Sequence, residues 1–153
     1  MYDQINFLQM KVTIKRVDKD LPLPQYETDG SVGFDILART ETVIEAKSLA
    51  LIPGNIVVEV PYGFMLVVAA RSSTPRKKGL LTPHGIGIID HDYCGPDDEI
   101  KIQVYNFNDE TVAVKRGDKI AQGIFVHIDK FEWAETEEMN NANRGGFGST
   151  DNK

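Results

Sequence analysis

The last residues of the chain combine groups that could close over a phosphorylated ligand that contains a ring. Arg144 offers a planar cationic fork, and Phe147 offers a ring for stacking. Glycines around them, including Gly148, let backbone N–H groups approach phosphate oxygens closely, and Ser149 and Thr150 add neutral donors. The segment therefore predicts a nucleotide-binding strap. A polar terminus with no binding role would have a similar composition.

A second candidate anion site precedes a predicted short helix. The segment Arg71-Ser72-Ser73 places a guanidinium and two hydroxyls beside the start of a helix predicted over 74–79, where unpaired N–H groups also point outward. Thr74 is expected to cap this helix, Pro75 suits its first turn, and Gly79 can end it. An ordinary helix cap with a surface arginine is the alternative interpretation.

The segment from Gly85 to Tyr93 joins a bare backbone to acidic side chains. The run Gly85-Ile86-Gly87-Ile88 is predicted to lie in a hydrophobic hairpin, where an exposed backbone edge can read a base by its amide pattern. Asp90, Asp92 and Tyr93 follow directly and supply two carboxylates and an aromatic ring. The alternative is a hairpin relieved by glycines that ends in a solvated acidic turn.

Two polar side chains stand in apolar surroundings. Asp35 follows Gly33-Phe34 and precedes Ile36, where an unpaired charge would be costly, so it is predicted to need a cation, a hydrogen bond or water. Gln122 lies inside an apolar strand. Asp35 could equally be a turn carboxylate, and Gln122 a satisfied polar group of the core.

Two other kinds of site are not favoured by the sequence. His84, His91, His127 and Cys94 lack the spacing of zinc ligands. A Ser–His–Asp arrangement built on Ser72 and His91 has no nucleophile-elbow motif to support it.

Short segments rich in Val and Ile recur between Gly, Pro, Asn and Asp residues, and several alternate apolar and polar side chains. They predict strands over 11–17, 42–44, 56–60, 64–69, 86–89, 100–107, 111–114 and 119–128. The turn Arg116-Gly117-Asp118 is expected to join the last two as a tight hairpin. This many short strands, with one short helix, predicts an all-β sandwich, jelly roll or barrel.

The 153 residues fit one domain, predicted over 10–131. Residues 1–9 are expected to be an extension ahead of it, and residues 132–153 a mobile acidic linker that leads into the strap. The formal charge of −6 argues against nucleic acid as a partner. The single cysteine excludes an intrachain disulfide. No apolar run suits a signal peptide or a membrane span, so a cytoplasmic location away from membranes is expected.

Taken in order, these segments resemble the five motifs of the homotrimeric dUTPase family. The motifs are similar, in order, to residues 33–38, 61–63 with 71–73, 87–95, 116–122 and 143–150. The resemblance therefore extends over nearly the whole chain. Each motif is short, but five matches in the same order are specific.

The resemblance implies a β jelly-roll fold, also called a β-clip fold. It also implies a homotrimer whose active sites are shared between subunits. It implies Mg²⁺-assisted hydrolysis of dUTP to dUMP and pyrophosphate, which limits uracil in DNA and supplies dUMP for dTMP synthesis. Asp90 would position the water that attacks the α-phosphorus, since a carboxylate can orient and partly deprotonate water. Tyr93 would pack under the deoxyribose and exclude a 2′-hydroxyl. The backbone of Gly85, Ile86, Gly87 and Ile88 would read the uracil edge.

The resemblance also implies roles for the remaining site residues. The phosphates would be held by Arg71, Ser72, Ser73 and Gln122. Asp35 would lie near the water shell of the metal and contact it only through water. The strap would act as a lid that brings Arg144 to the γ-phosphate and Phe147 over the uracil, with Gly148, Ser149 and Thr150 beside them. The spacing from Arg144 to Phe147 is two residues shorter than in many members of the family. The resemblance therefore supports the role of Phe147 more strongly than that of Arg144.

Two alternatives to this function follow from the same fold. A dCTP deaminase-like enzyme would need extra groups to displace the 4-amino group of cytosine, and the strap with Phe147 favours the hydrolase. A non-catalytic nucleotide-binding module would be indicated by loss of Asp90 or of the strap, and both are present.

Overall fold

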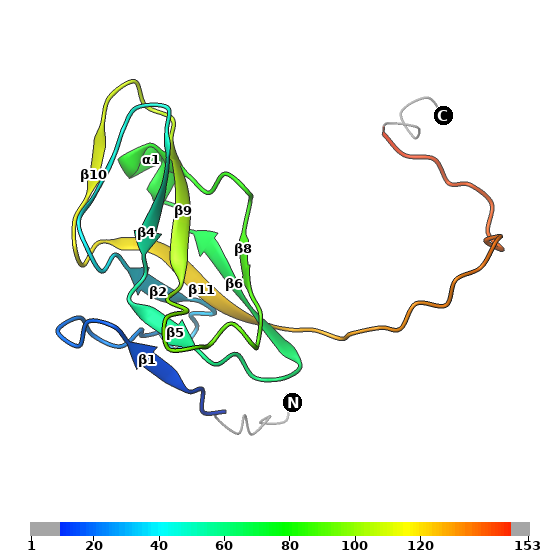
Figure 1. Cartoon of the computed structure of the whole chain (residues 1–153). Helices are drawn as coiled ribbons and strands as arrows, with labels where there is room; N and C mark the ends of the chain where they lie inside the picture. The colour runs from blue at the N-terminus through cyan, green and yellow to red at the C-terminus, as the bar shows by residue number, and fades with distance from the viewer. Residues whose placement is uncertain (1–9, 148–153) are drawn as a thin grey trace.

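The computed structural model describes residues 10–147, and its elements are nearly all short β-strands (Figure 1). The strands are β1 (Ile14–Arg16), β2 (Phe34–Leu37), β3 (Thr42–Ile44), β4 (Leu49–Pro53), β5 (Ile56–Val58), β6 (Phe64–Ala70), β7 (Leu80–Leu81), β8 (Gly87–Ile89), β9 (Lys101–Asn106), β10 (Val112–Val114) and β11 (Lys119–His127). The described residues contain one helix, α1 (Thr74–Lys78), between β6 and β7. The predicted all-β class with one short helix is confirmed.

The strands of residues 10–147 form four small sheets in which all pairs run antiparallel. The largest sheet has the order β2-β11-β6-β8, and the next has the order β4-β9-β7. Two further pairs, β1-β5 and β10-β3, complete the body. Successive strands pass from one sheet to another, because β6 and β8 belong to the largest sheet whereas β7 and β9 belong to the second. Most neighbours within a sheet are therefore distant in sequence.

The core is built by alternation along the strands. In β9, Ile102 and Val104 are buried, while Lys101 and Gln103, which alternate with them, are more exposed. This is the period of two that places successive side chains on opposite faces of a sheet. The most deeply buried side chains of the described residues include Ile36, Ile44, Ile52, Leu66, Leu80, Ile100 and Ile120.

One close contact fixes how β2 lies against β11. Phe34 of β2 pairs with Gly123 of β11, and a Cβ atom on residue 123 would come within 2.4 Å of the Phe34 ring. Such a separation is far below any normal van der Waals contact. The Phe34 ring can therefore lie across β11 only because residue 123 has no side chain.

All eight predicted strand segments contain a strand in the structure, but β2, β4 and β7 were not predicted. β7 has only two residues, which is too short to show a pattern. In β2, Asp35 interrupts an apolar run of four residues, and β4 ends at Pro53. Aspartate and proline are both depleted in strands, so their presence hides these two elements.

Two hairpins predicted from the sequence are wrong. The turn around Gly117 exists, since the Asp118 N–H donates to the Lys115 carbonyl at 3.0 Å. However, β10 pairs with β3, whereas β11 pairs with β2 and β6. Likewise residues 85–88 were predicted to lie in a hairpin, but β8 pairs with β6, whereas β7 and β9, its neighbours in sequence, pair with each other. Turn chemistry predicts where the chain reverses, and not which strand it pairs with next.

The short helix begins and ends close to the predicted residues. Ser73 is its N-cap rather than Thr74, which is the first helical residue, and the Ser73 side chain makes no capping hydrogen bond. The prediction of Thr74 as the cap is thus wrong by one residue, a usual uncertainty at helix ends. Gly79 ends the helix as predicted: its φ of 64° is left-handed, and its N–H donates to the Pro75 carbonyl at 2.9 Å.

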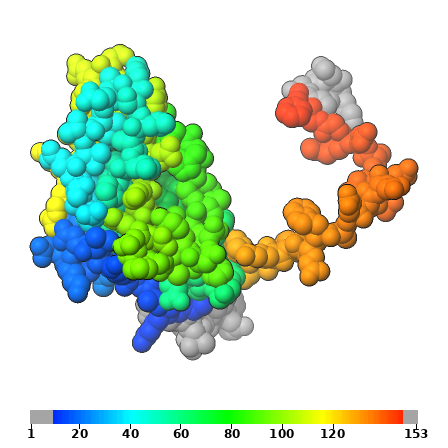
Figure 2. Space-filling model, in the orientation of Figure 1, coloured from blue at the N-terminus to red at the C-terminus, as the bar shows by residue number. Residues whose placement is uncertain are grey.

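After β11 the chain leaves the body. From residue 128 to residue 147 it contains no helix or strand and runs outward as an extended segment, drawn in orange and red in Figures 1 and 2. Residues 1–9 and Gly148, Ser149 and Thr150 of the predicted strap lie outside the described residues. In the part of the chain that the structure describes, no helix has the length and apolar character needed to cross a bilayer.

Candidate active site

A polar pocket of about 210 Å³ lies where the loop before β2, β2 itself, β11 and the segment after β6 meet. We call it the anion pocket. Its lining residues are Glu27, Ser31, Gly33, Asp35, Arg71, Ser72, Ser73 and Gln122. Five of these residues, Asp35, Arg71, Ser72, Ser73 and Gln122, were predicted as site residues. The structure thus brings three of the five sequence motifs together in one hollow.

The register of β2 and β11 brings Asp35 and Gln122 to the same face. These two residues are paired directly across the strands. Between Lys119 and Ala121 the register shifts by one residue, so that Lys119 is opposite Leu37 while Ala121 is opposite Ile36. Because Leu37 and Asp35 share a face, this irregularity turns Lys119 toward the anion pocket, where regular alternation would point it away.

The charges at this pocket are paired. Arg71 Nε lies 2.7 Å from Asp35 Oδ1, and Lys119 Nζ lies 2.8 Å from Asp35 Oδ2, which is buried. Lys119 also contacts the carboxylate of Glu27. The hydrogen bonds to Asp35 and Glu27 raise the pKa of Lys119 above its ordinary value, so this ammonium is charged at neutral pH. Two cations therefore face two carboxylates.

Of the partners predicted for Asp35, which were a cation, a hydrogen bond or water, the structure supplies cations. Gln122 is both a satisfied polar group and a pocket residue. The Gln122 Nε2 donates to the Ala70 carbonyl at 3.0 Å, so its amide is fixed by the last residue of β6. The same side chain lines the anion pocket. Its orientation is thus held by the backbone of the neighbouring strand, which prepares it to contact a ligand.

The structure also adds pocket residues that sequence reasoning missed. Glu27 and Ser31 lie in the loop before β2, where the Thr28 N–H donates to Ser31 Oγ at 3.1 Å. This loop has no strand or helix pattern that could have indicated its position. Lys119 was noted only as part of a motif, because its contact with Asp35 depends on the register shift.

Asp90 lies in a different part of the same chain. It follows β8, which is an edge strand of the largest sheet with β6 as its neighbour. Ile89 pairs with Leu66, whereas Arg71 follows the other end of β6. At about 3.3 Å per residue, the five residues from Leu66 to Arg71 correspond to about 16 Å along the strand. A single chain does not bring Asp90 into the anion pocket.

The residues around Asp90 form an exposed turn. The Tyr93 N–H donates to the Asp90 carbonyl at 3.3 Å, and the Tyr93 hydroxyl donates to the Glu99 carbonyl at 3.4 Å. The ring of His91 lies against the ring of Tyr62, with centroids 4.0 Å apart. This contact joins the turn to the segment before β6, and it was not predicted.

The backbone predicted to read the uracil lies on an exposed edge. The β8 edge opposite β6 has no strand beside it among residues 10–147, and Gly85, Ile86 and Ile88 are exposed. Backbone donors and acceptors of such an edge can bind an extended ligand or a base. Arg144 and Phe147 are both exposed in the C-terminal segment that runs outward from the body.

A protein-only metal site is absent from the described residues, which contain no group of three or more His, Cys, Asp or Glu side chains able to hold an ion. Asp35 is already paired with two cations. Its charge is therefore balanced by protein groups, and its Oδ2 is buried.

Comparison with known proteins agrees with the family that the motifs resemble. The family model described as dUTPase matches residues 19–151. The chain belongs to the dUTPase family. The deoxyuridine 5'-triphosphate nucleotidohydrolase of Hydrogenobaculum sp. is 37% identical over 144 residues, which are 92% of this chain and 98% of that protein. The corresponding protein of Desulfitobacterium hafniense is 39% identical over 151 residues, 95% of this chain and 98% of the relative.

Solved dUTPase structures share the fold. The dUTPase of Streptococcus mutans has a TM-score of 0.72 at 31% identity and covers 78% of this chain, with 98% of its own length matched. The dUTPase of Staphylococcus bacteriophage 80alpha in complex with dUpNHpp has a TM-score of 0.80 over 92% of this chain and 98% of its own. Its identity of 22% supports the fold alone. The jelly-roll fold implied by the motifs is confirmed.

Proposed function

We propose that this member of the dUTPase family hydrolyses dUTP to dUMP and pyrophosphate. The observation that carries the proposal is the anion pocket, in which Arg71, Ser72, Ser73 and Gln122 converge from separate elements at the motif positions. Relatives that match nearly the whole chain are named as deoxyuridine triphosphate nucleotidohydrolases. The physiological consequence would be less uracil in DNA and a supply of dUMP for dTMP synthesis.

In the proposed reaction, Asp90 accepts a hydrogen bond from a water molecule and orients its oxygen toward the α-phosphorus. The new bond joins this oxygen to the α-phosphorus, and the bond from the α-phosphorus to the bridging β-phosphate oxygen breaks. Pyrophosphate leaves, and the water proton passes toward the Asp90 carboxylate. The products, dUMP and pyrophosphate, account for all atoms of dUTP and water.

Binding of the triphosphate needs positive charge beyond that of the anion pocket. Arg71 and Lys119 are balanced by Asp35 and Glu27, so the cluster at the pocket has no net charge. A dUTPase of phage phi11 is described with a structural Mg(II) ion. We assign Mg²⁺ as the cofactor here, and Asp35 would be the residue of this chain near its water shell. When bound, the metal would draw charge from the phosphates.

Selectivity is assigned to two features. Tyr93 is placed beneath the deoxyribose, where its ring leaves no room for a 2′-hydroxyl. The exposed β8 edge from Gly85 to Ile88 is assigned to the uracil, whose donors and acceptors it can match through backbone groups. The strap, from Arg144 through Gly148, Ser149 and Thr150, is assigned to closure over the nucleotide, with Phe147 on the base.

The site is proposed to be completed by other copies of the chain. Asp90 and the anion pocket lie at opposite ends of β6, and the C-terminal segment, which contains Arg144 and Phe147, runs outward from the body. A homotrimer that joins the Asp90 turn of one subunit to the anion pocket of another would resolve this separation.

The direct test is release of pyrophosphate from dUTP, dCTP, dTTP and UTP, each with and without Mg²⁺. We expect strong release from dUTP with the metal and weak release from the other nucleotides. Production of ammonia from dCTP would instead identify a deaminase. Tight binding of dUTP without turnover would identify a non-catalytic module.

A further inference from the structure

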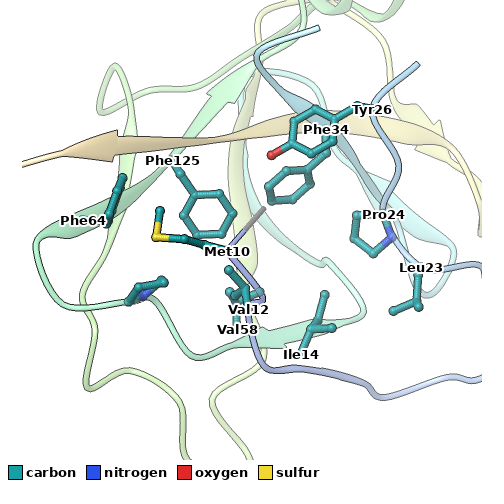
Figure 3. Close-up of a pocket in the computed structure, with 11 residues that line it drawn as sticks. Met10, Val12, Ile14, Leu23, Pro24, Tyr26, Phe34, Val58, Phe64 and Phe125 are labelled. Carbon is teal, nitrogen blue, oxygen red and sulfur yellow. The ribbon is translucent and has the colours of Figure 1, made fainter. Parts of the chain in front are cut away.

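The loop before β2 contributes side chains to two pockets. One is the anion pocket, which contains Glu27 of this loop. The other is a hollow of about 470 Å³ whose lining includes Leu23, Tyr26, Phe34 and Phe125 (Figure 3). We call it the apolar pocket. Because successive side chains of a strand point to opposite faces, the two pockets lie on opposite sides of β2.

Contacts on both sides of Glu27 hold it at the anion pocket. On one side, the ring of Tyr26 meets the ring of Phe34 edge to face in the apolar pocket, with centroids 6.0 Å apart and planes at 86° (Figure 3). On the other side, the Thr28 N–H donates to Ser31 Oγ at 3.1 Å. Glu27 lies between these two fixed points of the loop. Its carboxylate is therefore a built feature of the pocket lining.

The charged residues that line the anion pocket are unfavourable for an anion. They are Glu27, Asp35 and Arg71, which supply two carboxylates and one guanidinium. Lys119 does not belong to the lining, and its ammonium is held by Asp35 Oδ2 at 2.8 Å and by the Glu27 carboxylate. A phosphate group that enters the pocket thus meets one more carboxylate than cation.

The two carboxylates differ in how they are placed. The side chain of Asp35 is only 13% exposed and also pairs with Arg71 at 2.7 Å. The side chain of Glu27 is 60% exposed, and the cation beside it, Lys119, is shared with Asp35. The negative charge that faces an entering ligand is therefore that of Glu27. We infer that Glu27 is a specificity-determining residue, which lowers the affinity of the anion pocket for phosphate anions that carry no bound cation.

A repelling charge discriminates between ligands because its effect grows with the charge of the ligand. Free pyrophosphate carries more negative charge for its size than a triphosphate whose oxygens are bound to a divalent cation. Glu27 should therefore weaken binding of free pyrophosphate more than binding of the cation-bound nucleotide. This inference rests on the proposed function, in which pyrophosphate is a product. Glu27 would then favour departure of pyrophosphate from the anion pocket and disfavour its return.

The test measures binding of inorganic pyrophosphate to the full chain by isothermal titration calorimetry, with EDTA present. Glu27→Gln should tighten this binding by about fivefold to tenfold, the scale for one charge a few ångströms from a polyanion in water. The gain should shrink as salt is added, because salt screens exposed charges. Glu27→Lys should tighten binding further, whereas Glu27→Asp, which keeps the charge, should bind like the wild type. Glu41→Gln removes an exposed carboxylate outside both pockets and should also bind like the wild type.

A second titration tests selectivity. A non-hydrolysable dUTP analogue with Mg²⁺ should gain less affinity in Glu27→Gln than free pyrophosphate gains, and an equal gain for both ligands would overturn the inference. Pyrophosphate binding that is unchanged, weaker or undetectable in Glu27→Gln and Glu27→Lys would also overturn it, because Glu27 would then serve only to hold Lys119. These titrations need no turnover. Failure of the wild type to release pyrophosphate from dUTP would instead refute the proposed function, whatever the titrations show.

Discussion

Asp90 is the acidic residue on which the proposed chemistry depends, and its surroundings keep it available. It follows the edge strand β8, it is exposed, and its backbone carbonyl is held by the Tyr93 N–H. Its side chain makes no hydrogen bond or ion pair among the described residues. The turn therefore fixes the backbone and leaves the carboxylate for a ligand.

Replacement of Asp90 by Asn should lower kcat by about two or more orders of magnitude, because an amide cannot take up the proton of the attacking water. Binding of a non-hydrolysable dUTP analogue and the melting temperature should remain close to those of the wild type. Steady-state kinetics and calorimetry would measure both. Asp92→Asn is the matched control, and an equal loss in that variant would contradict the assignment to Asp90.

Tyr93 should set the preference for deoxyribose. In Tyr93→Ala the ratio of kcat/KM for dUTP over UTP should fall by about tenfold or more, since removal of a steric barrier in a pocket has effects of this order. Tyr93→Phe keeps the ring and loses only the hydroxyl that contacts the Glu99 carbonyl, so it should keep the ratio. An unchanged ratio in the alanine variant would leave Tyr93 a purely structural role.

Asp35 shows what sequence can predict about a single residue. Its charge in an apolar run predicted that it needs a cation, a hydrogen bond or water, and the structure supplies two cations. Which lysine would reach it could not be predicted, because Lys119 turns toward Asp35 only through the register shift in β11. The type of a residue predicts that its buried charge needs a partner, whereas the identity of the partner depends on how two strands align.

At the scale of elements, Glu99 joins two segments near the core. It is nearly buried, and Arg39 donates to both of its oxygens, at 2.7 and 2.9 Å, while the Asn55 N–H donates to Oε1 at 2.9 Å. Burial by itself would raise the pKa of Glu99, but the hydrogen bonds from Arg39 and Asn55 outweigh it, and the pKa lies below its ordinary value. The ionised form is thus bound more strongly in the folded state.

Glu99→Gln should lower the free energy of unfolding by about 2 kcal/mol at pH 7, the usual scale for hydrogen bonds to a charged group. Because folding lowers the pKa of Glu99, its contribution is present above the unfolded pKa of about 4.3 and is lost as pH falls toward the folded value. Urea unfolding at equal protein concentration should show the difference shrinking below that pH. The exposed Glu41→Gln is the control, and a difference that does not depend on pH would contradict the role of the charge.

Strands were predictable where apolar and polar side chains alternate, and less predictable where a residue of the pocket interrupts this alternation. β9 and β10 follow the period of two and were found from sequence. β2 was missed because Asp35, a pocket residue, stands inside it. Strand partners were not predictable, because the turns at Gly85 and Gly117 join different sheets.

At the scale of the molecule, the separation of Asp90 from the anion pocket leads to a test of shared sites. An Asp90→Asn chain and a chain that ends after Asn143 should each be nearly inactive alone. Mixed trimers should recover part of the activity, because some sites would combine an intact Asp90 with an intact strap. Activity is measured on mixtures whose composition is verified by native mass spectrometry. Verified mixed trimers that remain inactive would indicate sites built from one chain.

The contact between Phe34 and Gly123 has a consequence for the fidelity of folding. Phe34 lines the apolar pocket and Asp35 the anion pocket, so adjacent residues of β2 serve opposite faces. A slip of β2 by one residue along β11 would exchange these faces and set the Phe34 ring against Gln122 or Ile124. Misaligned chains would therefore lose both pockets together, and the Phe34 ring would clash with a side chain of β11. An error in strand pairing thus cannot yield a folded chain that keeps one of the two pockets.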